Sequence, residues 1–162
     1  MPENIHILAS QPSDAARVRG LIIAHWGDET VVVHGQVYRP HQHPGFFAWV
    51  NEELAGLITY RLEGDSCEIL TLDSYLPGQG IGTRLIAAVR QAARAAGCRR
   101  LWLITTNDNL HAIGFYQKRG FHLAAVHPGA VNRARQVKPS IPLIGENGIP
   151  LRDEIEFEEI LL

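Results

Sequence analysis

The sequence feature that most limits how this chain can fold is a glycine turn between an apolar strand and an amphipathic helix. Residues 67–72 are apolar and rich in strand formers, and apolar residues recur at helical spacing from residue 84 to Gly97. Between these two segments, glycines occupy three alternate positions, Gly78, Gly80 and Gly82. The stretch is therefore predicted to be a strand, a tight turn and a helix.

Such a turn is a candidate phosphate-binding site. Glycines let the backbone approach a ligand closely, and the first N–H groups of the helix point outward at its positive end. A P-loop is excluded because no Gly-Lys-Ser/Thr follows, and a dinucleotide fingerprint is excluded because Thr83 and Leu85 stand where a third glycine is needed. A strand-to-helix turn without a ligand is the alternative interpretation.

Two motifs in order make the chain similar to a known family. Residues 73–82, followed by an Ala-rich helix, resemble the acyl-CoA pyrophosphate loop of the GNAT N-acetyltransferases, whose pattern is Arg/Gln-x-x-Gly-x-Gly/Ala. Residues 109–121 contain an Asn, an Ala, a Tyr and a closing Gly-Phe, and look like the second motif of that family. The resemblance covers residues 48–126. Pro77 departs from it, because proline at the Arg/Gln position offers neither a long side chain nor a backbone N–H.

The resemblance implies a fold and a cosubstrate. The fold would be of the α/β (α+β mixed sheet) class, in which helices flank a mostly antiparallel central sheet with a splayed parallel strand pair, and one domain would span residues 1–162. The pantetheine arm of acetyl-CoA would enter between strands 67–72 and 99–106, where Leu72 is the candidate for backbone pairing. The cofactor-binding residues would be Leu72, Gly78, Gln79, Gly80, Ile81, Gly82, Thr83, Arg84 and Asn109. Asn109 is also a candidate helix cap.

The implied reaction is transfer of an acetyl group from acetyl-CoA to a primary amine by direct attack in a ternary complex. Tyr116 stands at the Tyr position of the family, where its hydroxyl would protonate the leaving thiolate; the alternative is an aromatic side chain that only packs. Glu68 is the first candidate for the base that deprotonates the amine, ahead of His111 and Asp73. Glu68 as a paired strand residue, His111 as an exposed helix residue, and removal of the proton by solvent are the alternatives.

A second functional class is a non-catalytic acyl-CoA sensor or regulatory module with the same fold. Tyr116 and the glycine loop favour the enzyme, whereas Pro77 leaves room for the sensor. The acceptor is not identified, because its pocket would come from residues 10–44 and the tail, which resemble the family least.

Composition and charge limit the partners. The chain has 162 residues and a net charge of -2, and its largest basic cluster is the pair Arg99-Arg100, so neither nucleic acid nor a membrane is expected as a partner. A cytoplasmic location is expected, and a homodimer stays open. Cys67 and Cys98 fit buried free thiols. A metal site is not expected, because the histidines at positions 41 and 43 lack an obvious third ligand.

The remaining elements are predicted from periodicity and turn residues. Strands are expected at residues 5–9, 30–33, 37–38, 45–51, 54–62, 121–126 and 153–161, and helices at 13–26, 109–120 and within 129–138. In the last strand, Glu154, Glu156 and Glu158 fall on one face, which is expected to be solvated.

Overall fold

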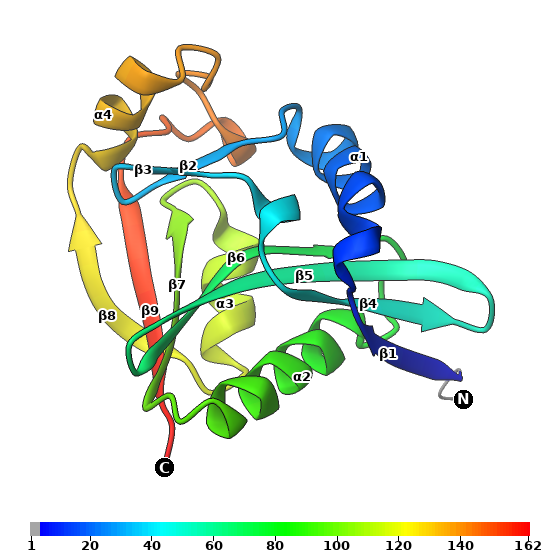
Figure 1. Ribbon diagram of the computed structural model, residues 1–162. Coiled ribbons are helices and arrows are strands. Elements are labelled where there is room, and N and C mark those ends of the chain that lie inside the picture. The colour runs from blue at the N-terminus through cyan, green and yellow to red at the C-terminus, as the bar shows by residue number, and fades with distance from the viewer. Residues whose placement is uncertain (1–3) are drawn as a thin grey trace. The chain divides into compact units, whose positions relative to one another are not determined.

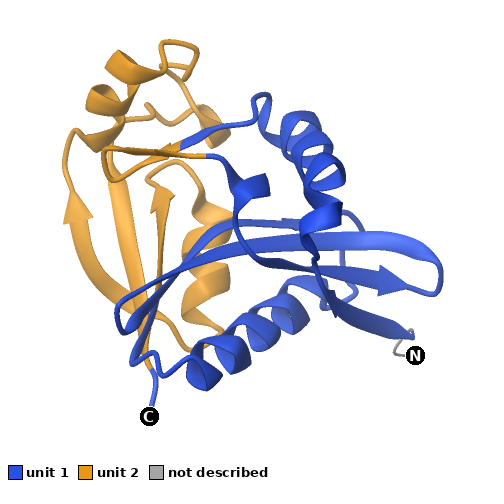
Figure 2. Cartoon of the chain, in the orientation of Figure 1, with its two compact units in different colours: residues 1–31, 39–101, 161–162 blue, residues 32–38, 102–160 orange. Residues whose placement is uncertain are grey.

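The computed structural model describes residues 4–162 (Figure 1), and the chain forms two compact units (Figure 2). Among the described residues, unit 1 comprises 4–31, 39–101 and 161–162, and unit 2 comprises 32–38 and 102–160. The predicted glycine loop therefore belongs to unit 1, and the predicted second motif belongs to unit 2.

Unit 1 contains a sheet of antiparallel strands. β1 (Ile5–Ala9) pairs with β4 (Gly45–Val50), β4 pairs with β5 (Glu53–Glu63), and β5 pairs with β6 (Ser66–Ser74). The tight turns between the last three strands use Asn51 and Gly64, which have φ angles of 56° and 58°. Asn and Gly are the residues that adopt this left-handed conformation most readily, so both turns follow from the sequence.

Two helices cover opposite faces of this sheet (Figure 1). Helix α1 (Ala15–Trp26) follows a short 3-10 turn, and its Val18 and Ile22 pack with Leu57 of β5. The neighbouring Gly56 instead faces helix α2 (Ile81–Ala95), where Ile81 lies closest. Successive strand residues point to opposite faces, so each helix buries its own side of β5.

The parallel strand pair begins in unit 1. The N–H groups of Arg99 and Arg100 donate to the carbonyl of Asp65 over 2.7 and 3.4 Å, just where β6 begins. Strand β7 (Arg100–Thr106) therefore starts beside the start of β6 and runs in the same direction. The parallel pair predicted from the sequence is confirmed at this position.

Unit 2 contains a β-hairpin, part of β7, two helices and the last two strands. These elements are β2 (Val31–Val33), of which Val31 lies in unit 1, β3 (Gln36–Tyr38), α3 (Leu110–Gln117), β8 (His122–His127), α4 (Ala130–Val137) and β9 (Glu154–Ile160). Within this unit, β9 lies between β7 and β8 and is antiparallel to β8. The fully buried Phe157 of β9 packs with the Tyr116 ring, 6.3 Å between centroids.

The proline-rich segment before β9 is bonded by Arg135 of α4, which donates to the carbonyls of Ile141, Pro142 and Leu151, and by two side chains at the corner between β7 and α3. Asp108 accepts a hydrogen bond from the Glu146 N–H (2.8 Å) and another from the Thr106 hydroxyl. The side-chain oxygen of Asn107 accepts from the N–H groups of Arg152 (3.0 Å) and Asp153 (2.9 Å). These bonds satisfy backbone donors that no regular element would satisfy, so the segment has a defined path.

Most predicted elements lie within a few residues of their expected positions, with two informative differences. Helix α2 begins at Ile81, earlier than the expected start at residue 84, so the loop's last glycine is already helical. The acidic face of β9 is not uniformly solvated, because Glu154 is 3% exposed. Cys67 and Cys98 are free and buried as predicted, and burial raises the pKa of the Cys67 thiol to about 12. In the described part of the chain, no helix is long and apolar enough to cross a membrane.

Gly56 allows α2 to lie close to the sheet, and we expect Gly56→Ala to destabilise the fold. An added Cβ would lie 2.6 Å from Cγ2 of Ile81 and 2.8 Å from the carbonyl oxygen of Asp73, which is backbone and has little room to move. Overpacking of this kind costs about 1–3 kcal/mol, measurable by urea unfolding.

Gly20→Ala in α1 is the matched control for this substitution. In the described part of the chain, no atom lies within 4 Å of a Cβ at Gly20, and alanine in a helix interior is favoured over glycine by about 0.5–1 kcal/mol. We therefore expect Gly20→Ala to stabilise the protein. Equal stability of Gly56→Ala and wild type would contradict the proposed close contact.

Candidate functional site

The glycine loop has the backbone conformation that only glycine adopts easily. Gly78 and Gly80 have φ angles of 76° and 73°, in the left-handed region, and Gly80 is the N-cap residue of α2. Among residues 4–162, no atom lies within 4 Å of a Cβ built on either residue. The two glycines are therefore required by the turn itself, and the outer side of the loop is open to a ligand.

The N-terminus of α2 presents a positive dipole end beside this loop. The helix bonds start with the Arg84 N–H, which donates to the carbonyl of Gly80 over 3.2 Å, and none of the described side chains caps the helix. Ile81 and Gly82 are buried, so they offer backbone N–H groups rather than side chains. Gln79, Thr83 and Arg84 are exposed. This combination of N–H groups and exposed polar side chains suits an anionic ligand.

Leu72 and Pro77 lie between β6 and the loop. Leu72 is paired with Ile58 of β5, which holds its backbone in the extended form expected for pairing with a ligand. The pairing of β5 and β6 continues to Tyr75, whose N–H donates to the carbonyl of Ala55 over 2.7 Å. Pro77 is exposed and has no N–H, so any anion in the loop relies on donors that follow it.

A cluster of polar and aromatic side chains lies where β6 ends and α1 ends. The indole N–H of Trp26 donates to both carboxylate oxygens of Asp73, at 3.1 and 2.9 Å, and the ring of Tyr75 stacks on His25 with 4.4 Å between centroids. The Tyr75 hydroxyl is buried without a hydrogen-bond partner among the described residues.

Burial controls the protonation of this cluster. Burial raises the pKa of Asp73, and the Trp26 hydrogen bond and the nearby His25 act in the opposite direction. Burial also raises the pKa of Tyr75. A carboxyl group with a raised pKa is a better proton acceptor than an ordinary one, and Asp73 lies five residues before Gly78. From sequence alone Asp73 is the last of three candidate bases, because its contact with Trp26 spans 47 positions and leaves no local pattern.

Glu68 lies near the other end of β6. It is the third residue of the strand, it is 1% exposed, and it accepts a hydrogen bond from Nε of Arg61 over 2.7 Å. Arg61 also pairs with Glu63. This arrangement corresponds to the alternative of a paired strand residue, which joins β5 and β6 across their hairpin.

The second motif forms α3 in unit 2. The side chain of Asn109 accepts a hydrogen bond from the Ala112 N–H over 3.1 Å, so Asn109 caps the helix as one alternative predicted. Tyr116 is 8% exposed and packs edge-to-face on Phe121, with 5.5 Å between centroids. His111 is exposed on the same helix. Tyr116 is thus rigidly held, which a packing aromatic and a positioned acid both require.

Comparison with known proteins identifies the class to which this fold and loop belong. The profile of the acetyltransferase (GNAT) family matches residues 12–121. The chain is 49% identical over 139 residues to the uncharacterized protein YdhI of Bacillus subtilis, which covers 85% of this chain and 86% of the relative. The chain therefore belongs to the GNAT acetyltransferase family.

Solved structures support the fold at lower sequence identity. An IAA acetyltransferase from Bacillus cereus superposes with a TM-score of 0.76 at 21% identity, covering 98% of this chain and 100% of that one. A Bacillus subtilis acetyltransferase solved in complex with CoA superposes with a TM-score of 0.68 at 21% identity, covering 99% of each chain. The predicted fold class is confirmed.

The raised pKa of Asp73 predicts a pH-dependent stability difference between wild type and Asp73→Asn. Where pH lies between the ordinary carboxyl pKa and the raised one, folded Asp73 holds more protons than the unfolded chain, so stability falls as pH rises. Asn does not titrate, so the melting temperature of Asp73→Asn relative to wild type should increase with pH across that interval.

Asp65→Asn, which alters an exposed aspartate of the same unit, is the control for the lost charge. Thermal melts at a series of pH values measure both differences. A difference for Asp73→Asn that does not change with pH, or that falls, would show that burial does not govern this carboxyl group.

Proposed function

We propose that the protein is an N-acetyltransferase that transfers the acetyl group of acetyl-CoA to a primary amine by direct attack in a ternary complex. The observation that carries the proposal is the open glycine loop at the N-terminus of α2, in a chain of the GNAT family. The complex of a similarly folded protein with CoA supports the choice of cosubstrate.

Acetyl-CoA, the acetyl donor, would be held mainly by backbone groups. The N–H groups from Gly78 to Thr83 bind the pyrophosphate. Pro77 stands where the family pattern has Arg or Gln, so the positive charge comes from Arg84 instead. The backbone of Leu72 pairs with the pantetheine arm. Asn109 contributes by fixing the start of α3 and, as the resemblance implies, by contacting the cofactor.

The chemistry needs a neutral amine and a protonated leaving group. In the proposed reaction, Asp73 accepts a proton from the ammonium form of the acceptor, and the amine nitrogen then attacks the thioester carbonyl. The C–N bond forms, the C–S bond breaks, and the hydroxyl of Tyr116 protonates the departing thiolate. The amine nitrogen loses its second proton as the amide forms, and this proton returns Tyr116 to its neutral form. We assign the base to Asp73 rather than Glu68, because Asp73 adjoins the loop and Glu68 is paired with Arg61 at the far end of β6.

Acetyl-CoA should raise the melting temperature of the protein. A ligand that binds only the folded state adds about 2.7 kcal/mol of stability at a hundred times its dissociation constant. ATP shares part of the nucleotide group and is the control ligand. Equal stabilisation by ATP and CoA in a thermal-shift titration would contradict the assignment.

Thr83→Glu tests whether the thermal stabilisation by CoA arises at the glycine loop. A carboxylate in the first turn of a helix favours the helix but repels a bound pyrophosphate, so this variant should fold and lose most of the CoA shift. Ala87→Glu carries the same charge on an exposed position one turn further along α2 and should keep the shift. Equal CoA shifts in the two variants would mean that the anion binds elsewhere.

Because Pro77 lacks the side chain and N–H of the family position, a second function is also considered, a non-catalytic acyl-CoA sensor with the same fold. Release of free thiol from acetyl-CoA in the presence of a panel of primary amines separates the two functions. A thermal shift with CoA but no thiol release from any amine would favour the sensor.

Tyr116→Phe tests the general acid. The substitution keeps the ring that packs on Phe121 and Phe157 and removes the transferable proton. We expect the chemical step to fall by roughly 10²–10⁴ with little change in CoA affinity, measured by single-turnover kinetics and calorimetry. An undiminished chemical rate would reduce Tyr116 to a packing residue.

A further inference from the structure

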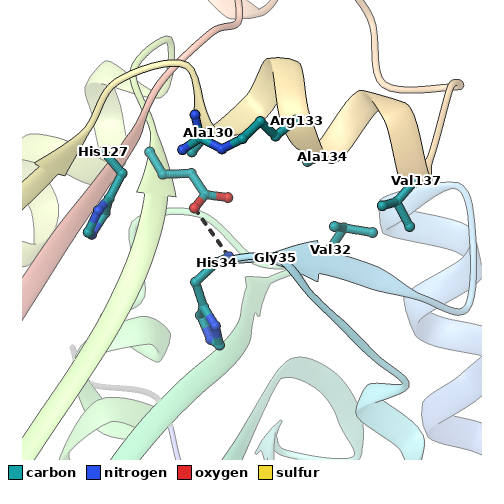
Figure 3. Close-up of a pocket in the computed structure, with 9 residues that line it drawn as sticks. Val32, His34, Gly35, His127, Ala130, Arg133, Ala134 and Val137 are labelled. Atoms are coloured by element: carbon teal, nitrogen blue, oxygen red, sulfur yellow. Dashed lines mark hydrogen bonds between the residues drawn. The ribbon is translucent and has the colours of Figure 1, made fainter.

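A pocket of about 380 Å³ lies within unit 2, between the β2–β3 hairpin and α4 (Figure 3). It is separate in sequence from the glycine loop and from the Asp73 cluster. Its lining residues come from β2 and the turn after it, β8, α4 and β9. A volume of this size falls in the range of roughly 300–1,000 Å³ that is typical of small-molecule sites.

The pocket has a polar end and an apolar end. Figure 3 shows Val32 and Val137 at one end, and His34, His127 and Arg133 toward the other. Ala134 of α4 lines the wall. A ligand that fits both ends has a charged or polar head and a short apolar body.

Glu154 is the buried charge of this pocket. It is almost fully buried and accepts a hydrogen bond from the backbone N–H of His34 over 3.2 Å (dashed in Figure 3). Among the described residues, Glu154 forms no ion pair. His127 is near, yet its ring nitrogen is hydrogen-bonded to Glu156 over 3.0 Å. Burial raises the pKa of Glu154 although His34, His127 and Arg133 act in the opposite direction. These groups therefore do not fully offset the cost of burying the carboxylate, which points to a further cationic group on the ligand.

Arg133 supplies the opposite charge at the exposed rim. Its Nη1 donates to the carbonyl of Pro128 over 3.3 Å, and the guanidinium carries five N–H donors in all, so donors remain for a carboxylate. A simple amine would gain from Glu154 but be repelled by Arg133. A ligand with both an ammonium and a carboxylate matches both charges.

We propose that this pocket binds an α-amino acid with an apolar side chain, whose ammonium contacts Glu154, whose carboxylate contacts Arg133, and whose side chain packs on Val32, Ala134 and Val137. This binding site does not rest on the proposed function. Glu154 lies on the face of β9 that alternation predicts to be solvated, and its contact with His34 joins segments 120 positions apart.

Calorimetry with leucine as the probe, on protein saturated with CoA, tests the binding. Two matched ligands each remove one charge: isoamylamine lacks the carboxylate, and N-acetylleucine lacks the ammonium. Each should bind at least about tenfold more weakly than leucine, since a charge-assisted contact corresponds to roughly 10–100-fold in affinity. Equal binding of leucine and isoamylamine would overturn the amino-acid assignment.

Substitutions of Glu154 and Arg133 test which side chain binds which charged group of the ligand. Glu154→Gln keeps an acceptor for the His34 N–H and should weaken leucine binding by about 10–100-fold. Arg133→Gln should weaken the binding of leucine but not that of isoamylamine. Arg152→Gln, which removes an exposed arginine of the same unit outside the pocket, should leave leucine binding unchanged. Unchanged leucine affinity in a folded Glu154→Gln or Arg133→Gln protein would overturn the proposed contacts.

The two proposals fail differently: absence of leucine binding together with an intact CoA thermal shift overturns the pocket assignment alone, whereas absence of any CoA shift contradicts the acetyltransferase proposal itself.

Discussion

The close approach of α2 to the sheet of unit 1 sets the position of the glycine loop. The helix can lie this near only because Gly56 has no side chain, so the first residue of α2, Ile81, packs directly on the backbone of β5. Ile81 and Gly82 are buried, so the first turn of the helix offers backbone N–H groups rather than side chains to a ligand. Packing inside the unit and ligand recognition outside it therefore depend on the same first turn of the helix.

The parts of the site that the sequence could predict are those built from neighbours in the chain. The three alternate glycines, the apolar strand before them and the helical periodicity after them are all within thirty-one residues, from 67 to 97, and they predicted the loop correctly. Asn109 and Ala112 are three positions apart, so the cap of α3 could also be predicted. The exact start of α2 could not, because it is decided by the contact of Ile81 with Gly56 on another element.

The parts that the sequence could not predict are polar contacts between distant segments. In the sequence, Asp73 does not differ from other acidic residues on strands. In the structure, the indole N–H of Trp26, at the end of α1, donates to both of its carboxylate oxygens. Glu154 followed the alternation expected for a solvated strand face, yet the β2–β3 hairpin and α4 lie over that face. Alternation predicts which residues share a face, but only tertiary structure decides whether the face meets solvent.

Because Asn107 and Asp108 anchor the proline-rich segment through its backbone, the path of that segment depends little on which side chains it carries. Both side chains bind backbone N–H groups, at Glu146, Arg152 and Asp153, so they impose no chemical demand on the side chains that the segment carries. Gly145 and Asn147 are exceptions, since a Cβ at Gly145 would meet the Asp108 carboxylate and the Asn147 side chain donates to the Asp108 carbonyl over 3.2 Å. The other exposed side chains of this surface can therefore change one at a time, as the loops of an antibody change on a constant framework, while the backbone keeps its path.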